Sequence, residues 1–284
     1  MNRFFHGSRG DSPAKRLLIH IVLICACIVA IYPFLRVVSI SLRPGSALFA
    51  TDLSLIPEGA TLNNYRSLIM EKDFTIWLWN SLLVSIATVI VGVLLAAAAA
   101  YAFSRWSFPG RRQGLLFLLT TQMLPPGMLL LPIYVMVVRL KLFNTYTGII
   151  LSYSAGSVPF SIWLLKGYYD TIPRELEEAA MVDGAGPLMA FYRVIVPLST
   201  PALAIAGLFS FMTAWSEFMM ARVMLQKAGM FTWPLGFQKL MDQFSTQWNM
   251  FAAASVLVAI PAMLLFLYSS KWLISGLTLG GIKE

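Results

Sequence analysis

The sequence has few charged residues and few of the side chains that carry redox or metal chemistry. Only 12% of its 284 residues are charged and 58% are apolar, whereas a soluble domain has about a quarter of its residues charged. Cys25 and Cys27 point to nearly opposite sides of a helix, so they can neither pair nor share a metal. His6 and His20 are too few for a histidine-rich metal site. We therefore expect a membrane protein with no metal site and no cofactor.

Motifs that are typical of enzymes are also missing. Neither H-E-x-x-H nor G-x-S-x-G occurs, so an intramembrane hydrolase has no motif to support it and no catalytic residue is expected. The pattern G-x-x-x-x-G-K-[ST] is absent, so the chain cannot cradle ATP with a phosphate loop of its own. Any ATP that it uses must be handled by a partner. The net charge of +8 lies mostly in small basic groups at the ends of apolar runs, which indicates orientation in a bilayer and no nucleic-acid binding.

Long apolar runs predict an all-α, polytopic fold with six transmembrane helices. Each run can cross about 30 Å of hydrocarbon. The basic residues around the first two inner segments place the amino terminus in the cytoplasm, and six spans return the carboxyl terminus to the same side. The expected spans are about 17–40, 76–103, 115–140, 146–168, 201–225 and 251–272.

Three polar residues inside the apolar runs are candidates for lining a transport pathway. Gln122 precedes Pro125 and Pro126, where a helix break is tolerated at membrane depth only if protein or a cavity shelters the backbone. Tyr153 lies in the serine-containing fourth span, and Glu217 is the one acid well inside a span. The alternatives are a packed kink at the prolines and a structural hydrogen bond from Glu217 to a neighbouring helix.

Residues 171–197 are the most hydrophilic segment in the second half of the chain, and they predict a pair of short amphipathic helices. Thr171 is expected to cap a first helix that runs to Val182, and Gly184 is expected to stop it. A second helix can begin at Pro187, since proline suits a first turn. Its predicted apolar face consists of Leu188, Phe191, Val194 and Ile195.

The spacing within this segment resembles the EAA loop of binding-protein-dependent ABC importer permeases. Glu178-Ala179-Ala180 is followed after three residues by Gly184, and Val194-Ile195-Val196-Pro197 stands where the family has I-x-L-P. The resemblance implies that the pair docks into a groove on a cytoplasmic ATPase. A hairpin lying on the bilayer is the alternative, but it would favour a basic polar face, and the first helix is acidic. The expected coupling residues are Glu178, Ala179, Ala180, Asp183, Gly184, Ala185, Leu188, Phe191 and Pro197.

The resemblance covers nearly the whole chain and is to the carbohydrate branch of the family. Tyr101-Ala102-Phe103-Ser104-Arg105 and residues 272–283 carry it, and within the branch the sequence is similar to the smaller permease of maltose and maltodextrin importers. This implies one permease domain over residues 1–284 in the bacterial inner membrane. The implied partners are a larger permease as heterodimer partner, two copies of a cytoplasmic ATPase and an external sugar-binding protein. Another sugar or a sugar phosphate is the alternative substrate, and an ion-coupled secondary transporter using Glu217 is the alternative class.

Two further segments receive a role from the resemblance. The loop of about residues 226–249 is expected to reach the sugar-loaded binding protein through Trp233 or Phe237, and the alternative is a loop that only covers its own helices. The carboxyl tail is expected to insert between the two ATPase subunits, and a frayed end is the alternative. Its implied contact residues are Gly280, Gly281 and Ile282.

Overall fold

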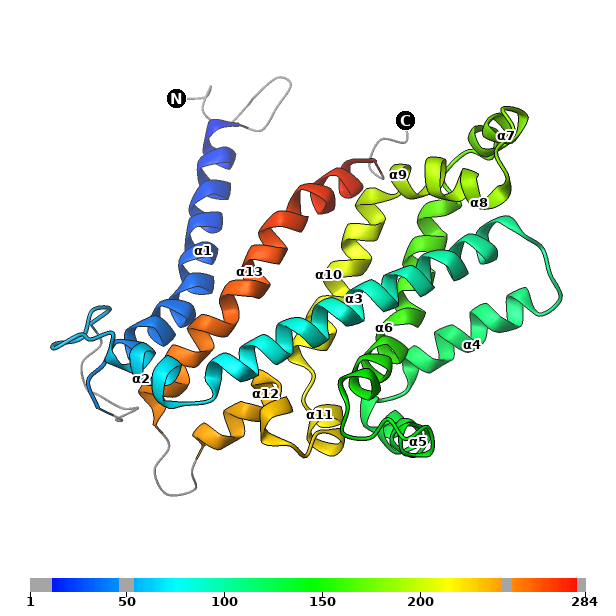
Figure 1. Ribbon diagram of the computed structural model, residues 1–284. Coiled ribbons are helices and arrows are strands. Elements are labelled where there is room, and N and C mark those ends of the chain that lie inside the picture. Colours follow the sequence, from blue (N-terminus) through cyan, green and yellow to red (C-terminus); the bar gives the residue numbers. More distant parts are fainter. Residues whose placement is uncertain (1–11, 46–53, 242–246, 280–284) are drawn as a thin grey trace. The chain divides into compact units, whose positions relative to one another are not determined.

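A computed structural model describes residues 12–45, 54–241 and 247–279, which form helices joined by short connections (Figure 1). These residues contain no β-strand, which confirms the all-α prediction. In the part of the chain described, four helices are long and apolar enough to cross a membrane, and up to six spans result if each of two bent helix pairs is one span.

The first compact unit comprises Met1–Lys72 and Leu240–Leu257. It contains α1 (Pro13–Ser41), α2 (Asn63–Glu71) and the beginning of α13 (Trp248–Leu279). The Asn64 amide donates hydrogen bonds to the carbonyls of Ser41 at 2.8 Å and Arg43 at 2.9 Å. The Asn249 amide donates to Asn64 Oδ1 at 2.7 Å. One buried amide side chain therefore joins the three helices of this unit.

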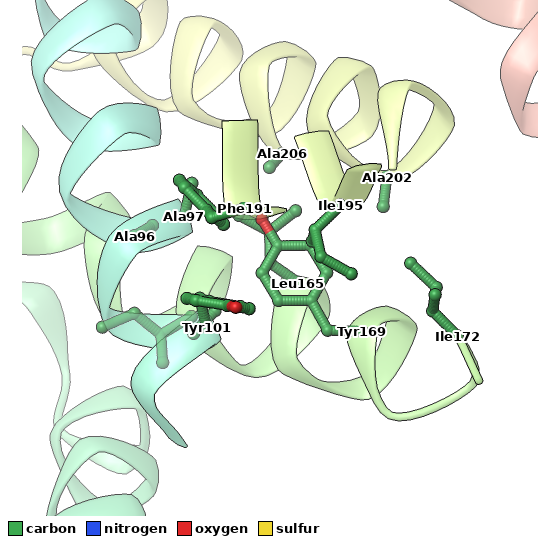
Figure 2. Packing of buried hydrophobic residues seen from close by; sticks show 12 residues of the cluster. Ala96, Ala97, Tyr101, Leu165, Tyr169, Ile172, Phe191, Ile195, Ala202 and Ala206 are labelled. Atoms are coloured by element: carbon green, nitrogen blue, oxygen red, sulfur yellow. The ribbon is translucent and has the colours of Figure 1, made fainter. Parts of the chain in front are cut away.

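The second compact unit comprises Asp73–Lys239 and Val258–Glu284. Its centre consists of three helices that pack side by side, namely α3 (Phe74–Arg105), α6 (Tyr146–Tyr169) and α10 (Thr200–Ser216) (Figure 1). Small buried residues, including Ala96 on α3 and Ala206 on α10, allow the backbones to approach closely. Figure 2 shows the apolar cluster that these residues share with larger side chains from the connection between α6 and α10.

The third expected span is broken at its two prolines, as predicted, and the fifth is broken where a continuous helix was expected. α4 (Arg111–Met123) and α5 (Pro126–Arg139) meet at an angle of 112°, which is sharper than the expected kink. The fifth span was expected to be one helix over about 201–225, and this is wrong: α10 ends at Ser216 and α11 (Met219–Met224) begins a new helix. The reason is Glu217, whose carboxylate accepts hydrogen bonds from the amides of Met220 at 2.9 Å and Ala221 at 3.2 Å and so satisfies the start of α11.

The structure describes the connection after α11 as far as residue 241. This connection contains η3 (Ala228–Met230), α12 (Trp233–Phe237) and η4 (Gln238–Leu240). The Asn80 amide donates to the carbonyls of Gly229 at 2.8 Å and Phe231 at 3.0 Å, and the Trp233 amide donates to Ser81 Oγ at 2.7 Å. This part of the loop therefore lies on α3. Phe237 is buried, so it is not the exposed contact that the loop was expected to present.

Gly236 is the residue of α12 that allows this close packing. A Cβ at Gly236 would lie 2.6 Å from Trp77 Cγ, so a side chain there would displace the buried indole. We predict that Gly236→Ala lowers the stability of the second unit by about 1–3 kcal/mol through overpacking. Thermal unfolding of the purified protein in detergent measures the effect. Gly167→Ala is the matched control, because a Cβ there meets nothing within 4 Å. Equal unfolding midpoints in the two variants would contradict the prediction.

Candidate functional site

The coupling segment, residues 171–197, forms α7 (Glu175–Val182), α8 (Pro187–Ala190), the π-helical turn η2 (Phe191–Ile195) and the start of α9 (Val196–Leu198). α7 and α8 are the predicted helix pair. The expected cap is wrong, because the Thr171 hydroxyl donates to the Tyr168 carbonyl at 2.7 Å and α7 begins only at Glu175. Pro197 was expected to close the second helix, but it lies inside α9, and Ser199 follows that helix.

Gly184 forms the corner between α7 and α8, as predicted. Its φ is +90°, in the left-handed region that glycine adopts at little cost. The Gly184 amide donates to the Met181 carbonyl and the Ala185 amide to the Ala180 carbonyl, both at 3.0 Å. This pair of bonds is the Schellman motif, which satisfies the last carbonyls of α7. The corner therefore has a defined geometry rather than a flexible one.

The inner face of the coupling segment packs on the membrane helices (Figure 2). Phe191 and Ile195, four residues apart, are buried, and the Phe191 ring lies 4.7 Å from the Tyr101 ring between centroids. The prediction that Phe191 faces a partner is therefore wrong. Leu188 and Tyr192, also four residues apart, are exposed and do not belong to the cluster. Helical periodicity alone had placed Leu188 and Phe191 on one face, and tertiary packing separates them.

The outer face of the coupling segment is apolar and exposed. Val182 is 88% exposed and Leu188 71% exposed, fractions that are large for side chains of this kind. Of the other predicted coupling residues, Glu178, Ala179, Asp183 and Pro197 are exposed and Ala180 and Ala185 are half-buried. We call the exposed apolar side chains the corner surface; they are Leu176, Met181, Val182, Leu188, Met189 and Tyr192.

A buried ion pair ties α7 to the end of α3. Arg105 Nε pairs with Glu177 Oε1, and both side chains are almost inaccessible. The Tyr101 hydroxyl donates to Glu177 Oε2 at 2.7 Å, and Arg105 Nη2 donates to the Ile172 carbonyl at 3.1 Å. Sequence reasoning missed this role and treated Glu177 only as an acid near a helix start. The available signal was the spacing of Tyr101 and Arg105, which places both on one face at the end of a span.

Asp170, just beyond the end of α6, makes a second polar link to α3. Ser104 Oγ donates to Asp170 Oδ1 at 2.7 Å, and Lys166 Nζ pairs with the other carboxylate oxygen. Burial alone would raise the pKa of Asp170, but the hydrogen bonds from Lys166 and Ser104 and the charges of Lys166 and Arg111 together lower it. A lowered carboxyl pKa contributes stability above the ordinary pKa, and this contribution is lost as the pH falls through the lowered value.

Gln122, Tyr153 and Glu217, the three pathway candidates, line one cavity of about 410 Å³ in the second unit. The breaks after α4 and α10 bring them together. Both Glu217 carboxylate oxygens bond to amides at the start of α11, so Glu217 has a structural role in the cavity wall. Sequence reasoning missed Ser210 and Thr213, which line the same cavity from α10. Among the described residues no group of three histidine, cysteine or acidic side chains could hold a metal ion.

Comparison with known proteins gives consistent matches over the chain. A family profile described as binding-protein-dependent transport system inner membrane component matches residues 89–277. The maltose/maltodextrin transport system permease protein MalG of Salmonella typhimurium is 38% identical, over 96% of this chain and 97% of its own length. MalG of Escherichia coli K12 is 36% identical, over 95% and 96%, and the maltodextrin transport system permease protein MdxG of Bacillus subtilis is 34% identical, over 95% and 96%.

A solved structure shares the fold. It is a crystal structure of a bacterial ABC transporter involved in the import of the acidic polysaccharide alginate, with a TM-score of 0.80, 23% sequence identity and coverage of 94% of this chain and 98% of that chain. A second structure, of the bacterial alginate transporter in complex with an alginate pentasaccharide-bound periplasmic protein, has a TM-score of 0.64, 14% identity and coverage of 90% and 93%. At these identities the likeness concerns the fold alone.

A substitution in the Arg105–Glu177 ion pair tests whether this pair holds α7 against α3. Glu177→Gln leaves the buried Arg105 guanidinium without a counter-charge, a change that costs about 3–5 kcal/mol when a buried pair is broken. We predict that amide hydrogen exchange in α7 becomes at least tenfold faster. Glu175→Gln is the matched control, because Glu175 is an exposed acid in the same first turn. Unchanged exchange in the Glu177 variant would show that the pair does not hold α7.

Proposed function

Because the chain belongs to the family of binding-protein-dependent transport system inner membrane components, we propose that it is the permease subunit of an ABC importer for sugars, with maltose and maltodextrins as substrates. The substrate proposal is supported by relatives that are named maltose/maltodextrin permeases and match over nearly their whole length. Another sugar or a sugar phosphate is the alternative. In this proposal the chain is a transport subunit, not an enzyme, and a partner hydrolyses ATP.

The observation that carries the coupling proposal is the corner surface. An apolar surface that is exposed on a rigid corner is a docking element for a cleft in another protein. The Schellman motif fixes the backbone of the corner, and the Arg105–Glu177 pair joins α7 to α3. In this proposal, a displacement of the corner therefore also displaces α3. We assign this surface to one of two copies of a cytoplasmic ATPase. The second copy binds a larger permease that completes a heterodimer, with both termini of this chain in the cytoplasm.

The cavity at the helix breaks suits a sugar pathway. Hydroxyl groups of Ser152, Tyr153, Ser157 and Thr213 line it together with the Gln122 amide, and such groups exchange hydrogen bonds with sugar hydroxyls. An ion-coupled secondary transporter would instead need Glu217 to bind and release a proton or ion. Because both Glu217 oxygens accept amide hydrogen bonds, this alternative has less support than the ABC importer.

Two contacts remain proposals that rest on the resemblance to the family. Gly280, Gly281 and Ile282, the proposed tail contacts with the ATPase subunits, lie outside the described residues. The connection of about residues 226–249 is proposed to meet the external sugar-binding protein. Since Phe237 is buried and Trp233 is half-buried, we move the proposed point of contact to the exposed Gln238.

Leu188→Asp tests the coupling proposal. Leu188 is exposed, so the aspartate leaves the fold intact, but it places a charge in an apolar contact. We predict that co-purification of the ATPase subunit and uptake of labelled maltose into membrane vesicles both fall at least tenfold. Asn63→Ala, an exposed change in α2, is the control and is expected to leave both measurements at the wild-type level. Wild-type ATPase recovery and uptake in the Leu188 variant would overturn the proposed docking.

A cysteine at position 238 tests the outer contact. Gln238→Cys is expected to cross-link to a secreted solute-binding protein when sugar is present, because the side chain is exposed. Phe237→Cys is the neighbouring control, and its buried position predicts little cross-linking. The cross-linked product is identified by mass spectrometry. Labelling of the Gln238 variant solely from the cytoplasmic side would contradict both the contact and the topology.

A further inference from the structure

The turn between α3 and α4 carries positive charge where a helix disfavours it. α4 begins at Arg111, with Gly110 at φ +85° as its N-cap and no side-chain hydrogen bond to the first turn. Arg111 and Arg112 occupy that turn, and it contains no acid. The amino end of a helix already bears a partial positive charge, so two guanidinium groups there favour the binding of an anion, and among the neighbouring acids the charge of Asp170 acts on Arg111.

Two cavities adjoin at this turn, and Arg111 lines both. The first has a volume of about 590 Å³ and polar walls. The second has a volume of about 260 Å³ and is lined by leucines and one tryptophan besides the arginines. The charged residues of the first are Arg105, Arg111, Asp170, Arg174 and Glu175, and the second is lined by Arg111, Arg112, Leu115, Leu116 and Trp163.

The charges around the two cavities leave a positive surplus. Arg105 pairs with Glu177, and Asp170 pairs with Lys166. The other charged lining groups are Arg111, Arg112 and Arg174 against Glu175, which is three positive charges less one negative charge, or a surplus of two. Arg111 is also held in place, because its Nε donates to the Phe103 carbonyl at 2.8 Å. The Arg111 side chain is therefore fixed by a contact within the protein and does not need a bound anion to hold it in place.

The apolar cavity indicates what kind of anion fits. Leu115 and Leu116 lie four residues after Arg111 and Arg112. Each arginine is therefore on the same face of α4 as one leucine, one helical turn before it. Trp163 lines this cavity beside the two leucines. A charged group followed by an apolar cavity along one helix matches the head and the hydrocarbon chain of an anionic phospholipid.

We propose that this basic turn binds one anionic phospholipid, such as phosphatidylglycerol. Its phosphate lies between Arg111 and Arg112 at the start of α4, and an acyl chain follows Leu115 and Leu116 past Trp163. The turn joins two apolar helices that belong to membrane spans, which is where lipid head groups lie. Free phosphate or an acidic side chain of a partner protein would satisfy the arginines but would leave the apolar cavity unfilled.

Lipid binding is measured on the full-length protein, purified in a non-ionic detergent and titrated with phosphatidylglycerol, by native mass spectrometry. Arg112 is exposed, so Arg112→Gln is expected to keep the fold and to weaken binding about fivefold, the factor that corresponds to about 1 kcal/mol per basic residue. Arg112→Lys keeps the charge and is expected to weaken binding less. Arg16→Gln, an exposed arginine near the start of α1 that lines neither cavity, is the matched control.

Two further arms separate a phospholipid from other anions. Leu116→Gln preserves the charge and is expected to weaken phosphatidylglycerol binding, and excess inorganic phosphate is expected to leave the lipid bound. Binding that is unchanged in Arg112→Gln, equal affinity for phosphatidylcholine, or displacement by inorganic phosphate would overturn the proposal. So would an Arg112→Gln variant that binds lipid normally but no longer recovers the ATPase subunit, since the basic turn would then contact protein.

Discussion

Hydrocarbon offers no hydrogen bonds, so every backbone amide and carbonyl at membrane depth must find a partner within the protein. Long helices meet this requirement along their length, and each break in a helix creates amides or carbonyls that need local partners. After α10 the Glu217 carboxylate supplies them, accepting from Met220 and Ala221 at the start of α11. After α7 the Schellman bonds at Gly184 and Ala185 do the same outside the apolar runs. Both helix breaks are therefore stabilised by specific hydrogen bonds within the protein.

The candidate sites lie at these breaks because a break is where polar groups become available. The ends of α4 and α10 bring Gln122, Tyr153 and Glu217 to one cavity, although they are far apart in the sequence. The corner at Gly184 exposes Leu188 and its apolar neighbours. The start of α4 at Gly110 leaves a first turn that carries only basic charge. Each site thus combines a helix terminus with side chains from a second element.

α3 links two of the functional regions through a single rigid element. It has 32 residues, which corresponds to a length of about 48 Å. Near its start, Asn80 and Ser81 hold the connection that contains α12, and at its end Tyr101 and Arg105 hold Glu177 of α7. α3 therefore forms a continuous path of helix and side-chain contacts from the coupling segment to the connection that contains α12. In the proposed coupling, this path carries a displacement of the coupling segment, and the buried ion pair suits that role because breaking it leaves an unpaired charge.

Hydrophobic run length, glycine and proline positions and the EAA spacing determined the helical class, the positions of most spans, the Gly184 corner and the family. These are local properties, since a helix and its stop signals are encoded within a few residues. Tertiary structure alone decided that Phe191 faces inward and Leu188 outward, because either face of the segment formed by α8 and η2 could have packed on α3. It also decided that Glu177 pairs with Arg105, which lies 72 residues away in the sequence. Such a pair forms through the packing of distant segments, and no local sequence pattern specifies it.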